Sequence, residues 1–160
     1  SFEVLTDNSD LIVTGKVTRS WTAWDASHHY IWTHYAVEVT SSQKGAPGGI
    51  LEISEPGGSA EGLTMTIAGT TSYNIGDNVL LFVQKMPNGM FRTTGWGQGK
   101  YTVDSRGRLR AEVALRSAQY VDLKTGAIVA PVSTLDGLTL QEAGLRVAAR
   151  IRAVRAGKVQ

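Results

Sequence analysis

The stretch Gly76-Asp77-Asn78-Val79-Leu80-Leu81-Phe82-Val83-Gln84-Lys85 opens with turn-forming residues, continues with five consecutive apolar residues and closes with polar ones. An apolar run this short predicts a strand that is buried on both faces. Pro87-Asn88-Gly89 follows, and a glycine in third place suits the left-handed position of a short hairpin loop. Residues 90–94 then return as the partner strand. We expect the other strands to curl around this hairpin and a C-terminal helix to cover it.

Length and composition restrict the class of protein. A chain of 160 residues is expected to form one domain, residues 1–160, with a core that needs no cross-links. The sequence contains no cysteine, which excludes disulfides, thiolate metal sites and a cysteine nucleophile. Its 18 glycines, together with frequent threonine and valine, favour a β-rich fold. No apolar run approaches the ~20 residues of a membrane span.

The net charge of +2 is unevenly distributed along the chain. Residues 1–104 carry 6 Lys and Arg against 10 Asp and Glu, whereas residues 105–160 carry 10 against 4. A basic C-terminal third can bind nucleic acid or an anionic surface. It can equally dock on the acidic remainder or keep a helix face solvated. We expect one of these last two roles, because no aromatic residue is interleaved with the helix arginines.

Residues 30–40 show the clearest alternation of the sequence and predict the second strand of the fold. Ile31, Thr33, Tyr35, Val37 and Val39 share one face, and Trp32, His34, Ala36, Glu38 and Thr40 share the other. Residues 10–21 predict the first strand, with Leu11, Val13 and Val17 on one face. Gly15 inside that strand indicates a bulge or bend.

The remaining segments are shorter. Strands are expected at 50–54, 63–67 and 100–104, loops at 43–49, 69–74 and 95–99, a turn at 105–108, and a small hairpin at 120–129. Phe2 and Leu5 are expected to face inward from a short helical turn or irregular lead-in.

The C-terminal segment predicts an amphipathic helix. Thr139 and Glu142 have the spacing of a capping box. Leu140, Ala143, Val147, Ala148, Ile151 and Val154 form an apolar stripe at helical spacing, and Gly157 is a suitable stop. We therefore expect a mainly β (α+β) fold, namely an OB-like, five- to six-stranded, partly open β-barrel with this helix at its C-terminus. The barrel core would be 1–104, an extra strand or hairpin region 105–135, and the helix 139–156.

Several motifs resemble those of a widespread set of uncharacterised exported bacterial domains. They are Asp10-Leu11-Ile12-Val13-Thr14-Gly15-Lys16-Val17, the Trp24/Tyr30 turn and strand, Gln43-Lys44-Gly45, Glu55-Pro56-Gly57-Gly58, Ile75-Gly76-Asp77 with Leu80-Leu81-Phe82-Val83, and Gly97-Gln98-Gly99-Lys100-Tyr101. Those domains are similar in strand layout to the OB-type barrels of netrin-like domains and tissue metalloproteinase inhibitors. The resemblance implies a barrel and export to the periplasm or the exterior. The start at Ser1 without Met agrees with a removed leader.

The inhibitors chelate the zinc of their target through an N-terminal cysteine, whereas this chain begins Ser1-Phe2 and has no cysteine. The resemblance therefore does not imply that mechanism.

A metal site has one candidate region, which contains Asp25, His28, His29 and His34. Zinc needs three or four ligands that converge at about 2.0–2.2 Å. His34 and Glu38 are roughly 13 Å apart along a strand, and adjacent histidines point apart in an extended chain. We expect exposed turn histidines here, with a metal site as the alternative, and no cofactor.

Other catalytic patterns receive little support. The sequence has no Gly-x-Ser-x-Gly elbow for a serine hydrolase. Residues 95–100 lack the Gly-Lys-Ser/Thr ending and the following helix of a phosphate-binding loop. Glu52, Glu55 and Glu61 lie beside turns, where solvated carboxylates are expected, and a glycosidase would need two of them about 5–9.5 Å apart in a cleft.

Tryptophans are the strongest candidates for ligand contacts. Trp21, Trp24 and Trp32 flank one turn, Trp96 lies in a glycine-rich loop, and Arg92 on the returning hairpin strand completes the candidate set. Exposed aromatic rings at a barrel rim would suit carbohydrate, peptide or single-stranded nucleic acid. The alternative, which the sequence favours, is that these rings cover the barrel ends and pack under the helix.

The sequence leaves three functions open. The first is a non-catalytic extracytoplasmic binding module, with a protein as the expected partner. The second is an OB-type binder of single-stranded nucleic acid or carbohydrate, which the basic C-terminal third would help. The third is a metal-dependent enzyme that uses His28, His29 or His34.

Overall fold

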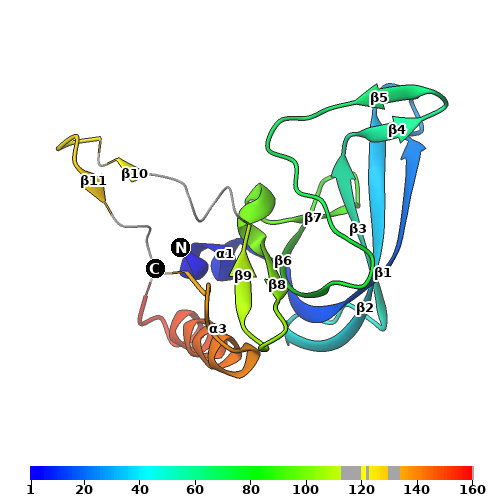
Figure 1. Cartoon of the computed structure of the whole chain (residues 1–160). Helices are drawn as coiled ribbons and strands as arrows, with labels where there is room; N and C mark the ends of the chain where they lie inside the picture. The colour runs from blue at the N-terminus through cyan, green and yellow to red at the C-terminus, as the bar shows by residue number, and fades with distance from the viewer. Residues whose placement is uncertain (113–119, 122, 130–133, 160) are drawn as a thin grey trace.

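The computed structural model describes residues 1–112, 120, 121, 123–129 and 134–159. The main feature of the fold is a seven-stranded antiparallel sheet (Figure 1). Six of its strands follow the order β3-β2-β1-β6-β8-β9, and the seventh, β7, pairs with β6 beside β8. The sheet is strongly curled, but its ends do not pair with each other. Among the described residues, no helix has the length and apolar character needed to cross a bilayer.

The elements, in chain order, are α1 (Phe2–Asn8), β1 (Leu11–Trp24), β2 (Ile31–Lys44), β3 (Ile50–Pro56), β4 (Gly58–Ala60), β5 (Leu63–Met65), β6 (Asn78–Lys85), β7 (Phe91–Thr93), the 3-10 helix η1 (Trp96–Gly99), β8 (Lys100–Val103), β9 (Leu109–Ala111), β10 (Tyr120–Val121), β11 (Ile128–Val129) and α3 (Leu140–Arg155).

The apolar run of residues 79–83 lies in the middle of the sheet, as predicted. Its strand β6 pairs with β1 on one side and with β8 and β7 on the other. Leu81 belongs to the core cluster inside the curl, whereas Phe82 belongs to a second cluster on the opposite face. Both side chains have no exposed surface, which confirms a strand buried on both faces.

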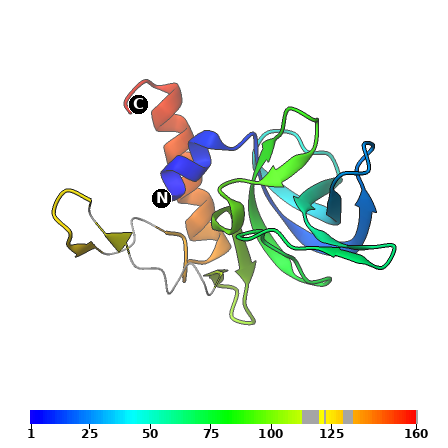
Figure 2. The ribbon, with the colours of Figure 1, turned by 90° about the horizontal axis from the view of Figure 1, so that it is seen from above.

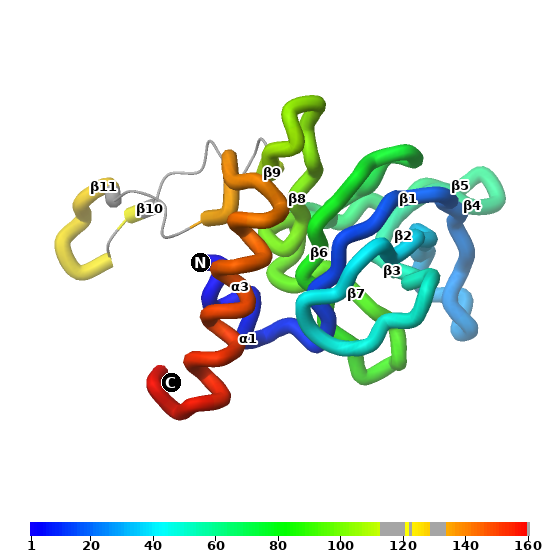
Figure 3. Tube along the Cα trace, turned by 90° about the horizontal axis from the view of Figure 1, so that it is seen from below, coloured from blue at the N-terminus to red at the C-terminus, as the bar shows by residue number. Residues whose placement is uncertain are grey.

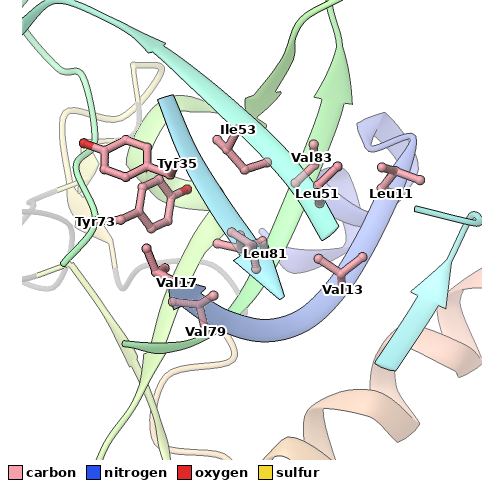
Figure 4. Packing of buried hydrophobic residues seen from close by; sticks show 11 residues of the cluster. Leu11, Val13, Val17, Tyr35, Leu51, Ile53, Tyr73, Val79, Leu81 and Val83 are labelled. Atoms are coloured by element: carbon pink, nitrogen blue, oxygen red, sulfur yellow. The ribbon is translucent and has the colours of Figure 1, made fainter. Parts of the chain in front are cut away.

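The first core cluster fills the inside of the curled sheet. It consists of Leu11, Val13, Val17, Tyr35, Val37, Leu51, Ile53, Tyr73, Val79, Leu81 and Val83 (Figure 4). The tyrosine rings of Tyr35 and Tyr73 adjoin each other at one end of this aliphatic group, with centroids 4.9 Å apart in an edge-on arrangement. The predicted inward face of the second strand is therefore confirmed.

The helices α1 and α3 lie together outside the curl of the sheet (Figures 2 and 3), and the second core cluster joins them to the face of the sheet opposite the first cluster. Phe2 and Leu5 reach it from α1, and Ala143 and Val147 reach it from α3. The capping box of Thr139 and Glu142 is present, as the sequence predicted. The two helices pack side by side, and an Arg150–Asp7 ion pair joins them.

Some local predictions need correction. Residues 43 and 44 belong to β2 and not to a loop, because the pairing with β1 continues as far as Lys44, which lies opposite Ile12. β5 pairs only with β4 in a small separate sheet, and residues 66–67 are not strand. Residues 96–99, predicted as part of a loop, form the 3-10 helix η1. The predicted hairpin at 120–129 is confirmed as β10 and β11, although residue 122 and the flanking segments 113–119 and 130–133 lie outside the described residues.

Gly15 occupies a point where β1 and β2 approach too closely for a side chain. The register of the two strands shifts between Thr14 and Gly15, as expected for a bulge. A Cβ atom on Gly15 would lie 2.4 Å from the carbonyl oxygen of Glu38 and 2.8 Å from Cγ1 of Val37. The glycine therefore permits the curvature of β1.

We expect Gly15→Ala to lower the free energy of unfolding by about 1–3 kcal/mol, because the added methyl overpacks a backbone contact. Urea denaturation followed by tryptophan fluorescence measures this change. Gly144→Ala in α3 is the matched control, since a Cβ atom there meets nothing within 4 Å and alanine favours a helix by roughly 1 kcal/mol. Equal stability of Gly15→Ala and the wild type would contradict the assigned register.

Candidate functional site

The outer surface of the β1–β2–β3 meander carries the first candidate site. Strand registers place Arg19, Trp21 and Ala23 of β1 opposite Ala36, His34 and Trp32 of β2, and these lie opposite Glu52, Ser54 and Pro56 of β3. This surface faces away from the first core cluster, because the alternate residues Tyr35, Val37, Leu51 and Ile53 point into that cluster. We call the set Arg19, Trp21, Trp32, His34, Glu52, Ser54 and Pro56 the outer aromatic face.

Rings and charges on the outer aromatic face are in direct contact. The Trp21 and His34 rings stack with centroids 5.5 Å apart and planes 24° apart. The guanidinium carbon of Arg19 lies 5.0 Å from the centroid of Trp21 on this face. His34 Nδ1 lies 2.7 Å from Ser54 Oγ and 3.3 Å from a Glu52 carboxylate oxygen. These contacts hold Trp21 and His34 in fixed orientations on the sheet surface.

Trp24 lies in a different environment from Trp21 and Trp32. Its ring stacks on His28 with centroids 4.2 Å apart, and His28 Nε2 lies 3.8 Å from a Glu61 carboxylate oxygen. The indole Nε1 of Trp24 is buried and has no hydrogen-bond partner within the described part of the chain. Trp24 therefore packs on the β1–β2 turn rather than contributing to the outer aromatic face.

The predicted metal candidates do not converge. Asp25 Oδ1 accepts hydrogen bonds from the Ser27 hydroxyl and from the backbone N–H groups of His29 and Tyr30, which is the work of a turn-forming aspartate. His28 stacks on Trp24, and His34 lies on the outer aromatic face. Across the described ranges, no three His, Asp or Glu side chains form a group that could hold a metal ion.

Glu55 connects β3 and β7, the two strands between which the curled sheet is not closed by backbone pairing. It is the penultimate residue of β3 and has no exposed surface. Its Oε1 accepts the backbone N–H of Thr93 in β7 at 2.9 Å, and its Oε2 lies 3.2 Å from an Arg92 guanidinium nitrogen. Burial raises the pKa of Glu55, and the donors from Thr93 and Arg92 only partly offset this effect. The Glu55 carboxylate therefore links β3 to β7, in the position where backbone hydrogen bonds would link two paired strands.

Arg92 and Trp96 form a second pair of candidate residues that the fold brings together. The guanidinium carbon of Arg92 lies 4.8 Å from the Trp96 ring centroid. Trp96 is 45% exposed and has a φ angle of 59°, a left-handed conformation that is unusual for a bulky residue. The indole of Trp96 covers one side of the Arg92 guanidinium, and the buried Glu55 is the other partner of Arg92. Arg92 and Trp96 therefore lie over the contact between β3 and β7, which we call the β3–β7 junction.

A buried polar network continues from this junction. The Tyr73 hydroxyl shares a hydrogen bond with Thr93 Oγ1, and burial followed by the Glu55 charge raises the pKa of Tyr73 well above its usual range. Lys100 donates to the Ser72 carbonyl and lies 4.8 Å from the centroid of the Tyr73 ring. Thr71 donates to Glu112, whose carboxylate also lies 3.6 Å from Lys100 Nζ. The phenol of Tyr73 therefore stays neutral between two pairs of opposite charges.

A cavity of about 300 Å³ lies beside this network, at the end of the curl that carries β4 and β5. Its lining comes from residues 33 and 35 of β2, residues 55–58 where β3 turns into β4, and residues 64–67 and 70–72. The lining mixes hydroxyl groups with the apolar side chains of Met65 and Ile67. Such a pocket is near the lower end of the size range for small-molecule sites.

Sequence reasoning missed the buried members of these sites. The prediction that Glu55 is a solvated turn carboxylate is wrong, because β7 supplies it with partners from 37 and 38 positions further along the chain. The sequence assigned Tyr73 and Lys100 to a loop and a strand without special roles. One signal was available for Glu55, since it continues the alternation of Leu51 and Ile53.

Comparison with known proteins identified no related family. The sequence matches no protein-family model, and the search of curated proteins returned no significant similarity.

Proposed function

We propose that this chain is a non-catalytic, extracytoplasmic binding module that takes a protein partner on its outer aromatic face. One observation supports this proposal above all: Trp21 and His34 are stacked on the solvent side of the sheet rather than packed in either core. Large aromatic rings held rigidly at a surface lose little conformational entropy on binding. Tryptophan and arginine are also the residues that most often dominate binding energies at protein interfaces.

The charges around the outer aromatic face favour a protein over a nucleic acid. Lys16 and Arg19 alternate with Glu38 and Glu52 along the same surface. A surface of mixed sign provides no continuous positive groove for a phosphate backbone. Ile50, which is 71% exposed, extends the apolar part of the surface at the end of β3. Aromatic and aliphatic side chains framed by both charge signs match the core and rim of a protein interface.

Several arginines of the basic C-terminal third, residues 105–160, form contacts within the chain. Arg150 pairs with Asp7, Arg110 pairs with Asp104, and Arg108 donates to the Gly137 carbonyl. The contacts of Arg150 and Arg110 support the interpretation that part of the basic charge docks on the acidic residues 1–104. They weaken the support for the nucleic-acid binder, which stays an alternative that oligonucleotide titration can distinguish.

We further propose that the curl is an OB-like, partly open barrel related to the exported bacterial domains and, at fold level, to netrin-like domains. The succession β3-β2-β1-β6-β7, with Glu55 joining β7 to β3, supports a five-stranded ring of this kind. OB barrels use the outer face of strands 2 and 3 for binding. That face here includes Trp32 and His34 of β2 and Ser54 of β3, in agreement with the proposed site.

Replacement of Trp21 and Trp32 by alanine should weaken peptide binding at least tenfold. A peptide library displayed on phage is panned against the immobilised wild-type chain, and the dissociation constants of selected synthetic peptides are measured by fluorescence anisotropy. Truncation of an interface tryptophan typically costs about 2 kcal/mol or more, which corresponds to roughly a thirtyfold change in Kd. Leu63→Ala, at a 58% exposed side chain of β5, is the matched control and should change Kd less than about twofold.

Three results would count against the proposal. The first is peptides that bind the Trp21/Trp32 double variant as tightly as the wild type, with far-UV circular dichroism confirming that the variant is folded. The second is salt-sensitive binding of a single-stranded oligonucleotide that is lost with those tryptophans, which would favour the nucleic-acid alternative. The third is stoichiometric metal in protein purified without chelator, together with a hydrolytic activity that metal removal abolishes, which would favour the metal-dependent enzyme.

A further inference from the structure

The cavity beside the β3–β7 junction has the lining of a small-molecule site, and the outer aromatic face does not use it. Six of its lining residues define its character: Thr33, Pro56, Gly58, Met65, Ile67 and Thr70. They come from strands and connections far apart in sequence, and the backbone that joins them is constrained. Thr33 Oγ1 donates to the Gly57 carbonyl at 2.7 Å, which fixes the turn from β3 into β4 against β2.

The glycines of this turn shape one wall of the cavity. Gly57 and Gly58 have φ angles of 103° and 127°, which side-chain-bearing residues rarely adopt. A Cβ atom on Gly58 would lie 2.5 Å from Thr33 Oγ1 and 3.0 Å from Thr22 Cγ2. The close approach of β4 to β1 and β2 is therefore built into the sequence, and this wall is set by backbone geometry.

The hydroxyl groups of the lining include one that is left without a partner. Thr70 Oγ1 is buried and, within the described residues, makes no hydrogen bond. A buried hydroxyl without a partner costs about 1–3 kcal/mol relative to a paired one. Thr70 also lines the cavity, so a ligand bound there lies close enough to supply the missing partner.

Charge balance identifies the class of ligand. No Lys or Arg belongs to the described lining, so an anionic ligand would find no counter-charge there. The carboxylate of the lining, Glu55, is paired with Arg92 and has no exposed surface, so a cationic ligand would gain little from it. What remains is a set of hydroxyl donors and acceptors beside the apolar side chains of Met65 and Ile67. This combination suits a neutral molecule that has several hydroxyl groups and one apolar face.

We propose that this cavity binds a neutral, polyhydroxylated ligand of monosaccharide size. The hydroxyls of Thr33 and Thr70 contact the ligand's hydroxyl groups, and Met65 and Ile67 pack on its C–H face. A volume of about 300 Å³ accommodates one hexose ring with some ordered water. The cavity lining shares only Pro56 with the outer aromatic face, so either proposal can fail without the other.

The test is a titration of ¹⁵N-labelled chain with neutral sugars, namely the methyl glycosides of glucose, galactose and mannose, N-acetylglucosamine and xylose. We expect saturable amide shifts for at least one sugar, centred on Gly58, Met65 and Thr70, with a Kd in roughly the millimolar range. Met65→Trp fills the cavity and should weaken binding more than tenfold. Leu63→Trp, on the same strand but outside the cavity lining, is the matched control and should leave Kd unchanged.

Charged sugars separate the ligand classes. Glucosamine and glucuronate should bind no more tightly than the neutral sugars, and a preference above tenfold for either would overturn the neutral class. The absence of saturable shifts with every sugar of the panel would overturn the site. So would equal binding by Met65→Trp and the wild type. Shifts centred on Trp21 and Trp32 would assign sugar binding to the outer aromatic face instead, and would also overturn the cavity site.

Discussion

Arg92→Met should lower the free energy of unfolding by about 3–5 kcal/mol at neutral pH, because it leaves a buried carboxylate without its counter-charge. Glu55 has no exposed surface, and Arg92 is its charged partner in the structure. Methionine retains the length and the apolar part of the arginine side chain, so the change isolates the lost charge. Urea denaturation followed by circular dichroism measures the effect.

The loss of stability in Arg92→Met should depend on pH in a defined direction. Burial raises the pKa of Glu55 above its ordinary value of 4.5, so the folded chain binds this proton more tightly than the unfolded chain. The stabilising contribution of the protonated carboxyl is fully present below pH 4.5 and is lost as the pH rises through the folded-state pKa. Without Arg92 that pKa would be higher still. The urea midpoint of Arg92→Met should therefore fall more steeply than that of the wild type as the pH rises above 4.5.

A second substitution separates charge from packing in this experiment. Adding Glu55→Gln to Arg92→Met removes the uncompensated charge and retains an acceptor for the Thr93 N–H, so it should restore most of the lost stability. The control is Arg110→Met, which breaks the ion pair with Asp104 in a more exposed position and should barely move the urea midpoint. Additive effects of the two substitutions at Glu55 and Arg92 would contradict the proposed coupling across the β3–β7 junction.

Phe82→Ala should lower the free energy of unfolding by about 3–5 kcal/mol, through lost apolar burial and the cavity left behind. The Phe82 side chain has no exposed surface and belongs to the cluster that joins the sheet to α1 and α3. Its ring meets Tyr101 edge-on, with centroids 6.3 Å apart. Hydrogen exchange provides a local measurement, because the amides of α3 should lose protection more than those of β2.

The total stability of a domain is about 5–15 kcal/mol, so Phe82→Ala can leave little folded protein. Phe82→Leu is the milder variant for that case, and it should show a smaller loss with the same weakening of α3 protection. Leu81→Ala, on the opposite face of β6, is the matched comparison and should expose the inside of the curl without a selective effect on α3. A loss below about 1 kcal/mol for Phe82→Ala would contradict the placement of the helices on this face.

Local patterns were sufficient for the long strands, for the C-terminal helix and for the orientation of many side chains, whereas β4 and η1 were not predicted. The alternation of residues 31–39 placed Tyr35 and Val37 inside and Trp32 and His34 outside, because successive side chains of a strand point to opposite faces. The apolar run of β6 identified the middle of the sheet, and Thr139 with Glu142 identified the start of α3. Each of these features depends on neighbours within a few residues, which is information that a single sequence contains.

Such local patterns could not predict which distant segments pair with each other. Nothing near residue 78 indicates that β6 lies between β1 and β8, since any apolar strand would fit those positions equally well. The stacking of Trp21 on His34 required the register of β1 and β2, in which bulges shift the partners. Trp96 and Arg92 were candidates by residue type alone, and their contact depends on the turn into η1.

Periodicity and capping act over a few residues, so they predict the long strands, the C-terminal helix, the buried face of β2 and the apolar character of β6 on both sides. The burial of Glu55 and the cavity beside it arise instead from contacts between segments that are distant in the sequence. Both depend on β7 and on residues 64–72, which approach β3 through chain folding alone. A carboxylate beside a turn is solvated unless a distant segment covers it and supplies its donors, and here Thr93 and Arg92 do both.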